Sequence, residues 1–234
     1  MTTIFWAGDS TVQYNSILTY PQTGMGQVIH LYLKPEVQVF NTAKNGRSTK
    51  SYLDEERHLP IIENIKAGDL MFIQFGHNDE KITDPARYTE PYGAYQKNLR
   101  YMISIARDAG AYPVLITPLE RKSFSDGVLQ PSQHTEYVNA MKQVAEEDKV
   151  PLIDLFTMSR NKILEVGEQK SFEFYMELPA GVYPHFPDGL HDNTHLKYYG
   201  AVVFAGMICR GLKQLGGVYA DVLSEWSEEE IKLA

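Results

Sequence analysis

The chain has 234 residues, of which 43% are hydrophobic and 22% are charged, and this composition excludes an intrinsically disordered protein. The net charge of −8 argues against nucleic acid or an anionic membrane as a partner, because both attract basic surfaces. The sequence contains neither a membrane-length apolar stretch nor a basic and apolar secretion signal at its start, so we expect a cytoplasmic protein, or a secreted one if a leader has been removed. It predicts no oligomeric state.

Short apolar segments alternate along the chain with longer stretches of helical spacing. Strands are predicted at 3–8, 37–43, 69–76, 112–118 and 150–156, and helices at about 24–34, 56–66, 89–109, 131–148, 158–166 and 196–214. Several of the apolar segments are apolar at both alternating positions, which is typical of strands covered on both faces. The alternation predicts a single α/β domain with a five-stranded parallel sheet and helices on both faces.

Two segments depart from this alternation. Residues 168–192 are rich in aromatic residues and proline and are too long for an ordinary loop, so we predict an irregular insertion near the active site. Residues 217–234 form a C-terminal tail, whose segment 224–234 is predicted to be a solvated or interface helix. Cys209 is the single cysteine and lies in an apolar helical stretch, so we expect a buried, inert thiol.

Polar residues suited to acyl transfer follow the first three predicted strands. Ser10 follows the first strand, Gly46 the second and Asn78 the third. Each signal alone is that of an ordinary turn, because turns prefer Gly, Asn, Asp and Ser. In a doubly wound fold, however, the carboxyl ends of the strands form one edge, where ligands bind. Together these residues therefore supply a nucleophile and two donors for an oxyanion at one place.

A carboxylate and an imidazole lie close together near the C-terminus. Asp192 and His195 are three residues apart, and on a helical turn this spacing places both side chains on one face. A carboxylate beside a histidine fixes its tautomer and stabilises the imidazolium that forms when the ring takes a proton. With Ser10 the pair supplies the three roles of a Ser–His–Asp triad. The rival interpretation is a polar turn that caps the last helix.

Four blocks of this sequence resemble those of the SGNH (GDSL-like) hydrolases. They are "GDST" at 8–11, Gly46 after the second strand, "GHND" at 76–79 and "DNTH" at 192–195, and they stand in the family's order over nearly the whole chain. Thr of "GDST" stands where the superfamily often has Leu, and with the "NGRS" turn at 45–48 it resembles the rhamnogalacturonan acetylesterase branch.

The resemblance implies a three-layer α/β/α, flavodoxin-like fold that uses no metal and no other cofactor. It also implies that Ser10 is the nucleophile, that His195 is the general base and that Asp192 is its partner. The N–H groups of Ser10 and Gly46 and the Asn78 side chain would form the oxyanion hole. The substrate implied by this branch is an acetylated oligosaccharide of the pectin backbone.

Recognition of a uronate substrate by a protein of net charge −8 requires a locally basic cleft. The segment 41–53 carries Lys44, Arg47 and a further lysine with no acid around the proposed oxyanion glycine. We predict that Arg47 or Lys44 faces the substrate carboxylate, with Arg121 as a further candidate. The alternative for these residues is a solvated basic loop.

Three other functions remain open at this point. A deacetylase of the same superfamily could act on acetylxylan or on another neutral sugar or small ester. The segment "HDNTH" at 191–195 has the outline of a zinc-protease site, but its Asp is a methylene shorter than the Glu that acts as base there. The third alternative is a non-catalytic carbohydrate-binding domain, but it would not explain why the sequence contains Ser10, Asn78, Asp192 and His195 together.

Overall fold

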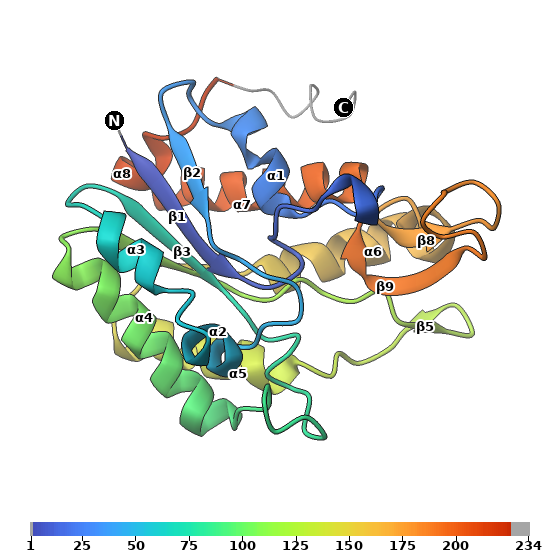
Figure 1. Cartoon of the computed structure of the whole chain (residues 1–234), viewed down its shortest axis with the longest axis horizontal. Helices are drawn as coiled ribbons and strands as arrows, with labels where there is room; N and C mark the ends of the chain where they lie inside the picture. The colour runs from blue at the N-terminus through green and yellow to red at the C-terminus, as the bar shows by residue number, and fades with distance from the viewer. Residues whose placement is uncertain (1, 226–234) are drawn as a thin grey trace.

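The computed structural model describes residues 2–225 and is built around a five-stranded sheet (Figure 1). Its strands, in chain order, are β1 (Thr3–Gly8), β2 (Gln38–Asn41), β3 (Leu70–Gln74), β4 (Tyr112–Ile116) and β7 (Leu152–Ile153). They lie in the order β2-β1-β3-β4-β7, and each adjacent pair is parallel. The predicted five-stranded parallel sheet is confirmed, and all five carboxyl ends point to one edge.

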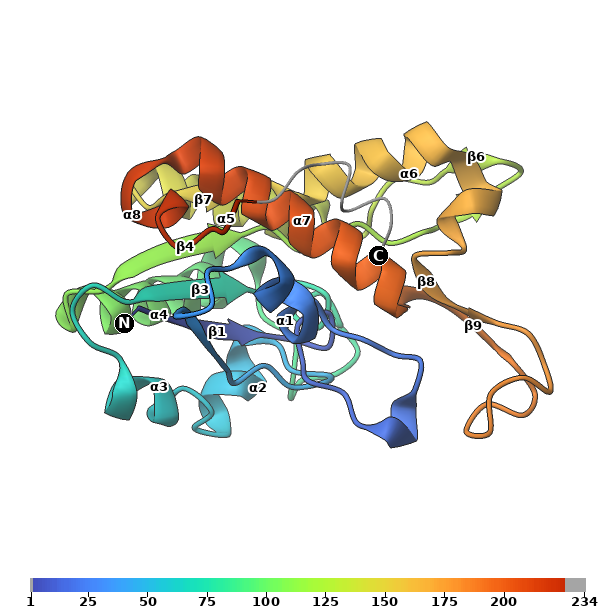
Figure 2. The same cartoon turned by 90° about the horizontal axis from the view of Figure 1, so that it is seen from above.

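Helices cover both faces of the sheet and form the outer layers. The α-helices are α1 (Met25–Val28), α2 (Thr49–Asp54), α3 (Leu59–Asn64), α4 (Gln96–Asp108), α5 (Thr135–Glu147), α6 (Leu155–Ser171), α7 (Tyr198–Leu215) and α8 (Gly217–Ala220). Short helical segments of other types are η1 (Ile17–Thr19), η2 (Ile29–Tyr32) and η3 (Pro91–Tyr95). Figure 2 shows α6 and α7 on one side of the sheet and α2 and α3 on the other.

Alternating residues of β1 enter two separate hydrophobic cores. Ile4 and Trp6 pack with residues of α1, α6 and α7, whereas Phe5 and Ala7 pack with residues of α2, α3, α4 and α5. Successive side chains of a strand point to opposite faces, so a strand between two helical layers must be apolar at every position. This confirms the three-layer α/β/α architecture.

The segment 168–192, predicted to be an irregular insertion near the active site, is irregular in part, because residues 172–174 and 179–189 lie outside the helices and strands. It contains the end of α6 and most of an antiparallel hairpin, β8 (Tyr175–Leu178) and β9 (Leu190–Leu196), which Figure 2 shows projecting from one end of the molecule. A smaller hairpin pairs β5 (Phe124–Ser125) with β6 (Val128–Leu129). Phe174 and Tyr175 are buried in the core beside α7, where the Phe174 and Phe204 rings lie 5.4 Å apart. The aromatic residues therefore anchor the hairpin to the sheet domain.

The remaining expectations concern the end of the chain. Cys209 is fully buried in α7, and burial raises the pKa of its thiol, as expected for an inert cysteine. Of the predicted C-terminal tail, α8 is described, and positions 226–234 lie outside the described residues. Within residues 2–225, no helix is both long and apolar enough to cross a membrane.

Candidate active site

The turn after β1 is held in a single conformation by its own side chains. The Asp9 carboxylate accepts hydrogen bonds from the backbone N–H of Thr11 at 3.0 Å and from its hydroxyl at 2.9 Å. A Cβ on Gly8 would lie 3.0 Å from the Val12 side chain, so only glycine fits there without a shift. Ser10 lies between these residues with 5% of its surface exposed. The turn therefore presents Ser10 at the carboxyl edge of the sheet.

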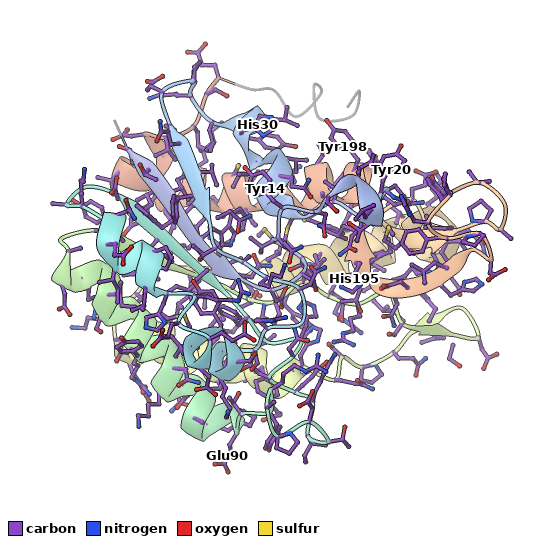
Figure 3. All side chains as sticks on the ribbon, in the orientation of Figure 1. Tyr14, Tyr20, His30, Glu90, His195 and Tyr198 are labelled. Carbon is purple, nitrogen blue, oxygen red and sulfur yellow. The ribbon has the colours of Figure 1, made fainter. Side chains whose placement is uncertain are left out.

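A polar cavity of about 460 Å³ opens at this edge and brings the predicted site residues together. Its lining includes Ser10, Gly46, Asn78, Asp192 and His195. These residues come from the segments after β1, β2 and β3 and from β9. Figure 3 shows His195 on the side of the sheet toward which β1 runs. Residues up to 185 positions apart in the chain thus share one cavity.

Asp192 holds the ring of His195 directly. The Oδ2 atom of Asp192 lies 2.6 Å from Nδ1 of His195, and Oδ1 accepts the backbone N–H groups of Thr194 at 2.8 Å and His195 at 2.9 Å. Burial would raise the pKa of Asp192, but the hydrogen bonds and charge of His195, together with these backbone donors, lower it to about 2. The ionised carboxylate keeps the proton on Nδ1 and leaves Nε2 as the basic nitrogen of the neutral ring.

The predicted reason for this pairing is wrong, although the pair itself forms. Asp192 and His195 lie in β9, not on a helical turn, and the register between β8 and β9 is irregular. The two side chains meet because Asp192 folds back onto the backbone of the next residues. The N-cap of α7 is Lys197, so Asp192 does not cap that helix.

Two of the three proposed oxyanion donors, Gly46 and Asn78, lie in the loops after β2 and β3. Gly46 has φ +75° in the turn after β2, a conformation that favours glycine. Asn78 donates one amide hydrogen to the carbonyl of Arg47 at 3.2 Å, while its Oδ1 accepts from Nη1 of Arg87 at 3.4 Å. These two contacts identify which end of the Asn78 amide is the nitrogen. The amide nitrogen carries two hydrogens and donates one to Arg47, so the other can donate to a ligand.

A buried contact between a histidine and a carboxylate, which the sequence did not predict, joins the nucleophile turn to the loop after β3. Nδ1 of His77 lies 3.1 Å from Oδ2 of Asp9, and Nε2 lies 2.8 Å from the carbonyl of Leu119. A carbonyl only accepts, so Nε2 carries a hydrogen, and the other ring nitrogen faces the Asp9 carboxylate. Burial raises the pKa of Asp9, but His77 and Thr11 outweigh it and lower the pKa. The only signal for this contact in the sequence was that Asp9 directly precedes Ser10 and His77 directly precedes Asn78.

Asp79 is a second buried anchor behind the site. It accepts the backbone N–H of Thr49 at 3.0 Å, the Thr49 hydroxyl at 2.5 Å and the Thr89 hydroxyl at 2.7 Å. Burial raises the pKa of this carboxyl to about 7, against the lowering effect of those hydrogen bonds. Asp79 thereby connects the start of α2 to the loop that carries Asn78.

The basic residues in the cavity differ from those predicted on the segment 41–53. Lys44 and Arg47 are not among the lining residues, and Arg47 pairs instead with Glu55 at 2.9 Å. Arg121 does line the cavity, together with Lys81 and Arg87, which the sequence did not single out. The guanidinium of Arg47 is thus engaged by Glu55, just beyond α2, and contact of Lys44 or Arg47 with a substrate carboxylate stays a prediction.

The zinc-protease outline at 191–195 does not form a joint site. His191 is exposed and pairs with Glu177 at 2.6 Å, whereas His195 pairs with Asp192. The segment is a strand, so it lacks the helical i, i+4 geometry of that motif. Among residues 2–225, no group of three or more His, Cys, Asp or Glu side chains is arranged to hold a metal.

Comparison with known proteins agrees with this geometry. The model of the GDSL-like Lipase/Acylhydrolase family matches residues 7–193. The chain belongs to this family. It is therefore a carboxylic ester hydrolase, and the resemblance stated from the four sequence blocks is confirmed.

Three proteins are similar to this chain in sequence or in structure. The chain is 39% identical to a probable rhamnogalacturonan acetylesterase, YesY, of Bacillus subtilis, over 91% of this chain and 93% of YesY. It is 37% identical to the rhamnogalacturonan acetylesterase RhgT of the same organism, over 91% of this chain and 90% of RhgT. The crystal structure of B. subtilis protein YxiM superposes with a TM-score of 0.77 at 27% identity, over 92% of this chain and 57% of that one.

Proposed function

We propose that this protein is a serine esterase that removes O-acetyl groups from pectin-type, rhamnogalacturonan oligosaccharides. The observation that carries the proposal is the 2.6 Å contact of Asp192 with His195 at a cavity that Ser10, Gly46 and Asn78 also line. A basic imidazole, a hydroxyl and two N–H donors facing one cavity are the parts that acyl transfer requires.

The proposed reaction proceeds in two halves. The Ser10 hydroxyl attacks the acetyl carbonyl while Nε2 of His195 accepts its proton. The oxyanion then receives hydrogen bonds from the N–H groups of Ser10 and Gly46 and from the Asn78 amide. The tetrahedral intermediate collapses as His195 protonates the departing sugar oxygen, leaving an acetyl ester on Ser10. His195 next removes a proton from water, which attacks this ester and releases acetate.

The relatives support the pectin-type substrate within this proposal. Two of them are named rhamnogalacturonan acetylesterases and align over about nine-tenths of each chain. The test is acetate release from acetylated rhamnogalacturonan oligosaccharides and from acetylated xylan. We expect kcat/KM to be at least about tenfold higher on the first substrate, a difference of about 1.4 kcal/mol in transition-state stabilisation. An equal or higher value on xylan would replace the pectin assignment by a neutral-sugar deacetylase.

A further inference from the structure

Three cationic side chains line one side of the catalytic cavity. Lys81 and Arg87 come from the loop between β3 and η3, and Arg121 follows β4. The whole protein carries a net charge of −8, so this gathering of positive charge runs against the molecule's overall balance. A locally basic cavity in an acidic protein indicates a ligand that is itself anionic.

The two arginines already have partners. Arg121 pairs with Glu80 at 2.6 Å and donates to the carbonyl of His77 at 3.2 Å. Arg87 pairs with Asp84 at 2.5 Å and contacts the Asn78 amide. Their positive charges are thus largely balanced before any ligand arrives.

Lys81 differs from the arginines in this respect. Within residues 2–225 its ammonium makes no hydrogen bond or ion pair, although the side chain is half-buried. Burial lowers the pKa of Lys81, and the charges of Arg87 and Arg121 lower it further, against the opposite effect of Glu80 and Asp84. The ammonium therefore lacks the stabilisation that a charge at this depth requires.

Within residues 2–225, the carboxylates in and around the cavity are paired with groups other than Lys81. Asp192 also lines it, but both of its oxygens are occupied by His195 and the following backbone. Glu80 and Asp84 face Arg121 and Arg87. In the described part of the chain, Lys81 is consequently a cationic side chain of the cavity without a paired carboxylate, and the carboxylate of a ligand could pair with it.

We propose that Lys81, assisted by Arg87, binds the carboxylate of a uronate residue of the substrate and so determines which acetyl esters are hydrolysed. This inference rests on the proposed function, because it names the substrate group that the same cavity recognises. A carboxylate is the ionised group of an acidic sugar, and charge-assisted hydrogen bonds to Lys and Arg recognise it strongly.

The position of Arg87 connects this site with the reacting ester. Its Nη1 atom lies 3.4 Å from Oδ1 of Asn78 and 3.6 Å from the place that a Cβ on Gly46 would occupy. Both of these residues are the proposed oxyanion donors. A carboxylate held by Arg87 would therefore lie beside the proposed oxyanion donors, in a cavity of about 460 Å³ that Lys81 also lines, and this volume is typical of small-ligand sites.

The first experiment compares two substrates that differ only in charge. One is an acetylated oligosaccharide containing galacturonate, and the other is the same oligosaccharide after its carboxylates are reduced to alcohols. For the wild type we expect kcat/KM to favour the charged substrate about tenfold or more. In Lys81→Gln this preference should fall about tenfold, mainly through KM, and Lys81→Arg should retain most of it. Lys97→Gln, which removes an exposed lysine of α4 outside the cavity, should match the wild type.

An unchanged preference in Lys81→Gln would overturn the proposal. The preference of the wild type for the charged substrate should also weaken as NaCl rises from 0.05 to about 0.5 M, because salt screens partly exposed charges. A preference that does not respond to salt would argue equally against recognition by charge.

The second experiment measures binding without turnover, so that it does not depend on the proposed reaction. Ser10→Ala protein, with and without Lys81→Gln, is titrated calorimetrically with unacetylated trigalacturonate and separately with sodium acetate. We expect Lys81→Gln to weaken trigalacturonate binding about tenfold. Acetate binding as tight as that of trigalacturonate would mean that the site holds the product anion and would refute substrate recognition. A folded wild type that hydrolyses neither ester would instead refute the proposed function, while the titration still decides the carboxylate site.

Discussion

At the scale of single residues, the site depends on which nitrogen of His195 carries the proton. The Asp192 carboxylate lies 2.6 Å from Nδ1, and its pKa of about 2 keeps it ionised throughout the pH range in which an esterase works. The proton of the neutral ring therefore stays on Nδ1, and Nε2 is the base. The proposed mechanism requires that tautomer at both of its proton transfers.

Asp192→Asn tests this requirement. An asparagine that places its amide N–H toward Nδ1 would move the ring proton to Nε2, which could then no longer accept from Ser10. We expect kcat for acetate release to fall by about 10³-fold or more at pH 7, with little change in the melting temperature. A kcat within tenfold of the wild type in a folded Asp192→Asn protein would contradict the assigned role of Asp192.

The buried Asp79 makes a prediction about stability and pH. Its pKa is about 7 in the folded protein and about 3.8 in the unfolded chain, so between these pH values the folded state binds more protons. The contribution of Asp79 to the free energy of unfolding is therefore complete below pH 4 and declines as pH rises toward 7, by up to roughly 1.4 kcal/mol per pH unit.

Asp79→Asn removes this titration, and comparison with the wild type isolates it from other groups. Urea unfolding of both proteins at pH 4, 5.5, 7 and 8 measures the difference. We expect the wild type to lose stability relative to Asp79→Asn from pH 4 to 7 and the difference to level off above that range. A difference that is constant with pH would show that Asp79 is ionised in the folded state.

At the scale of elements, the β8–β9 hairpin is the part that the sequence did not predict correctly. The pattern resembles a loop, because the prolines of this segment lie in the 179–189 connection between the two strands and a register shift between Tyr175 and Glu177 interrupts the pairing. The nearness of Asp192 to His195 was predicted from their spacing, but on a helical turn. It arises instead from backbone hydrogen bonds within a strand, which spacing alone cannot distinguish.

Gly200 determines how closely this hairpin approaches α7. A Cβ on Gly200 would lie 2.1 Å from the carbonyl oxygen of Phe174, and this oxygen belongs to backbone that cannot move alone. Gly200→Ala should displace the hairpin, lower the free energy of unfolding by about 1–3 kcal/mol and reduce kcat by shifting Asp192 and His195.

Gly211→Ala is the matched control in the same helix. Its Cβ would meet the side chain of Ile153, 2.7 Å away, at a position outside the catalytic cavity. We expect a loss of stability with kcat retained. If Gly200→Ala and Gly211→Ala change kcat equally, the hairpin does not position the site.

At the scale of the whole molecule, the parallel sheet explains why the candidate site could be predicted at all. Ser10, Gly46 and Asn78 each follow a strand, and all parallel strands end at one edge, so topology alone brings them together. Of the cationic side chains that line the cavity, Arg121 was predicted, but Lys81 and Arg87 were not. Arg47 pairs with Glu55 just beyond α2, a helix absent from the predicted elements, and Lys81 reaches the cavity through the path of an irregular loop.

The measurement that tests the central claim most directly is acetate release by Ser10→Ala. With acetylated rhamnogalacturonan oligosaccharides, we expect the rate to fall by about 10⁴-fold or more, while circular dichroism and the melting temperature remain those of the wild type. Ser104→Ala, on α4 and outside the cavity, should keep the wild-type rate. Substantial acetate release by a folded Ser10→Ala protein would contradict the account, because the acyl group would then have another acceptor.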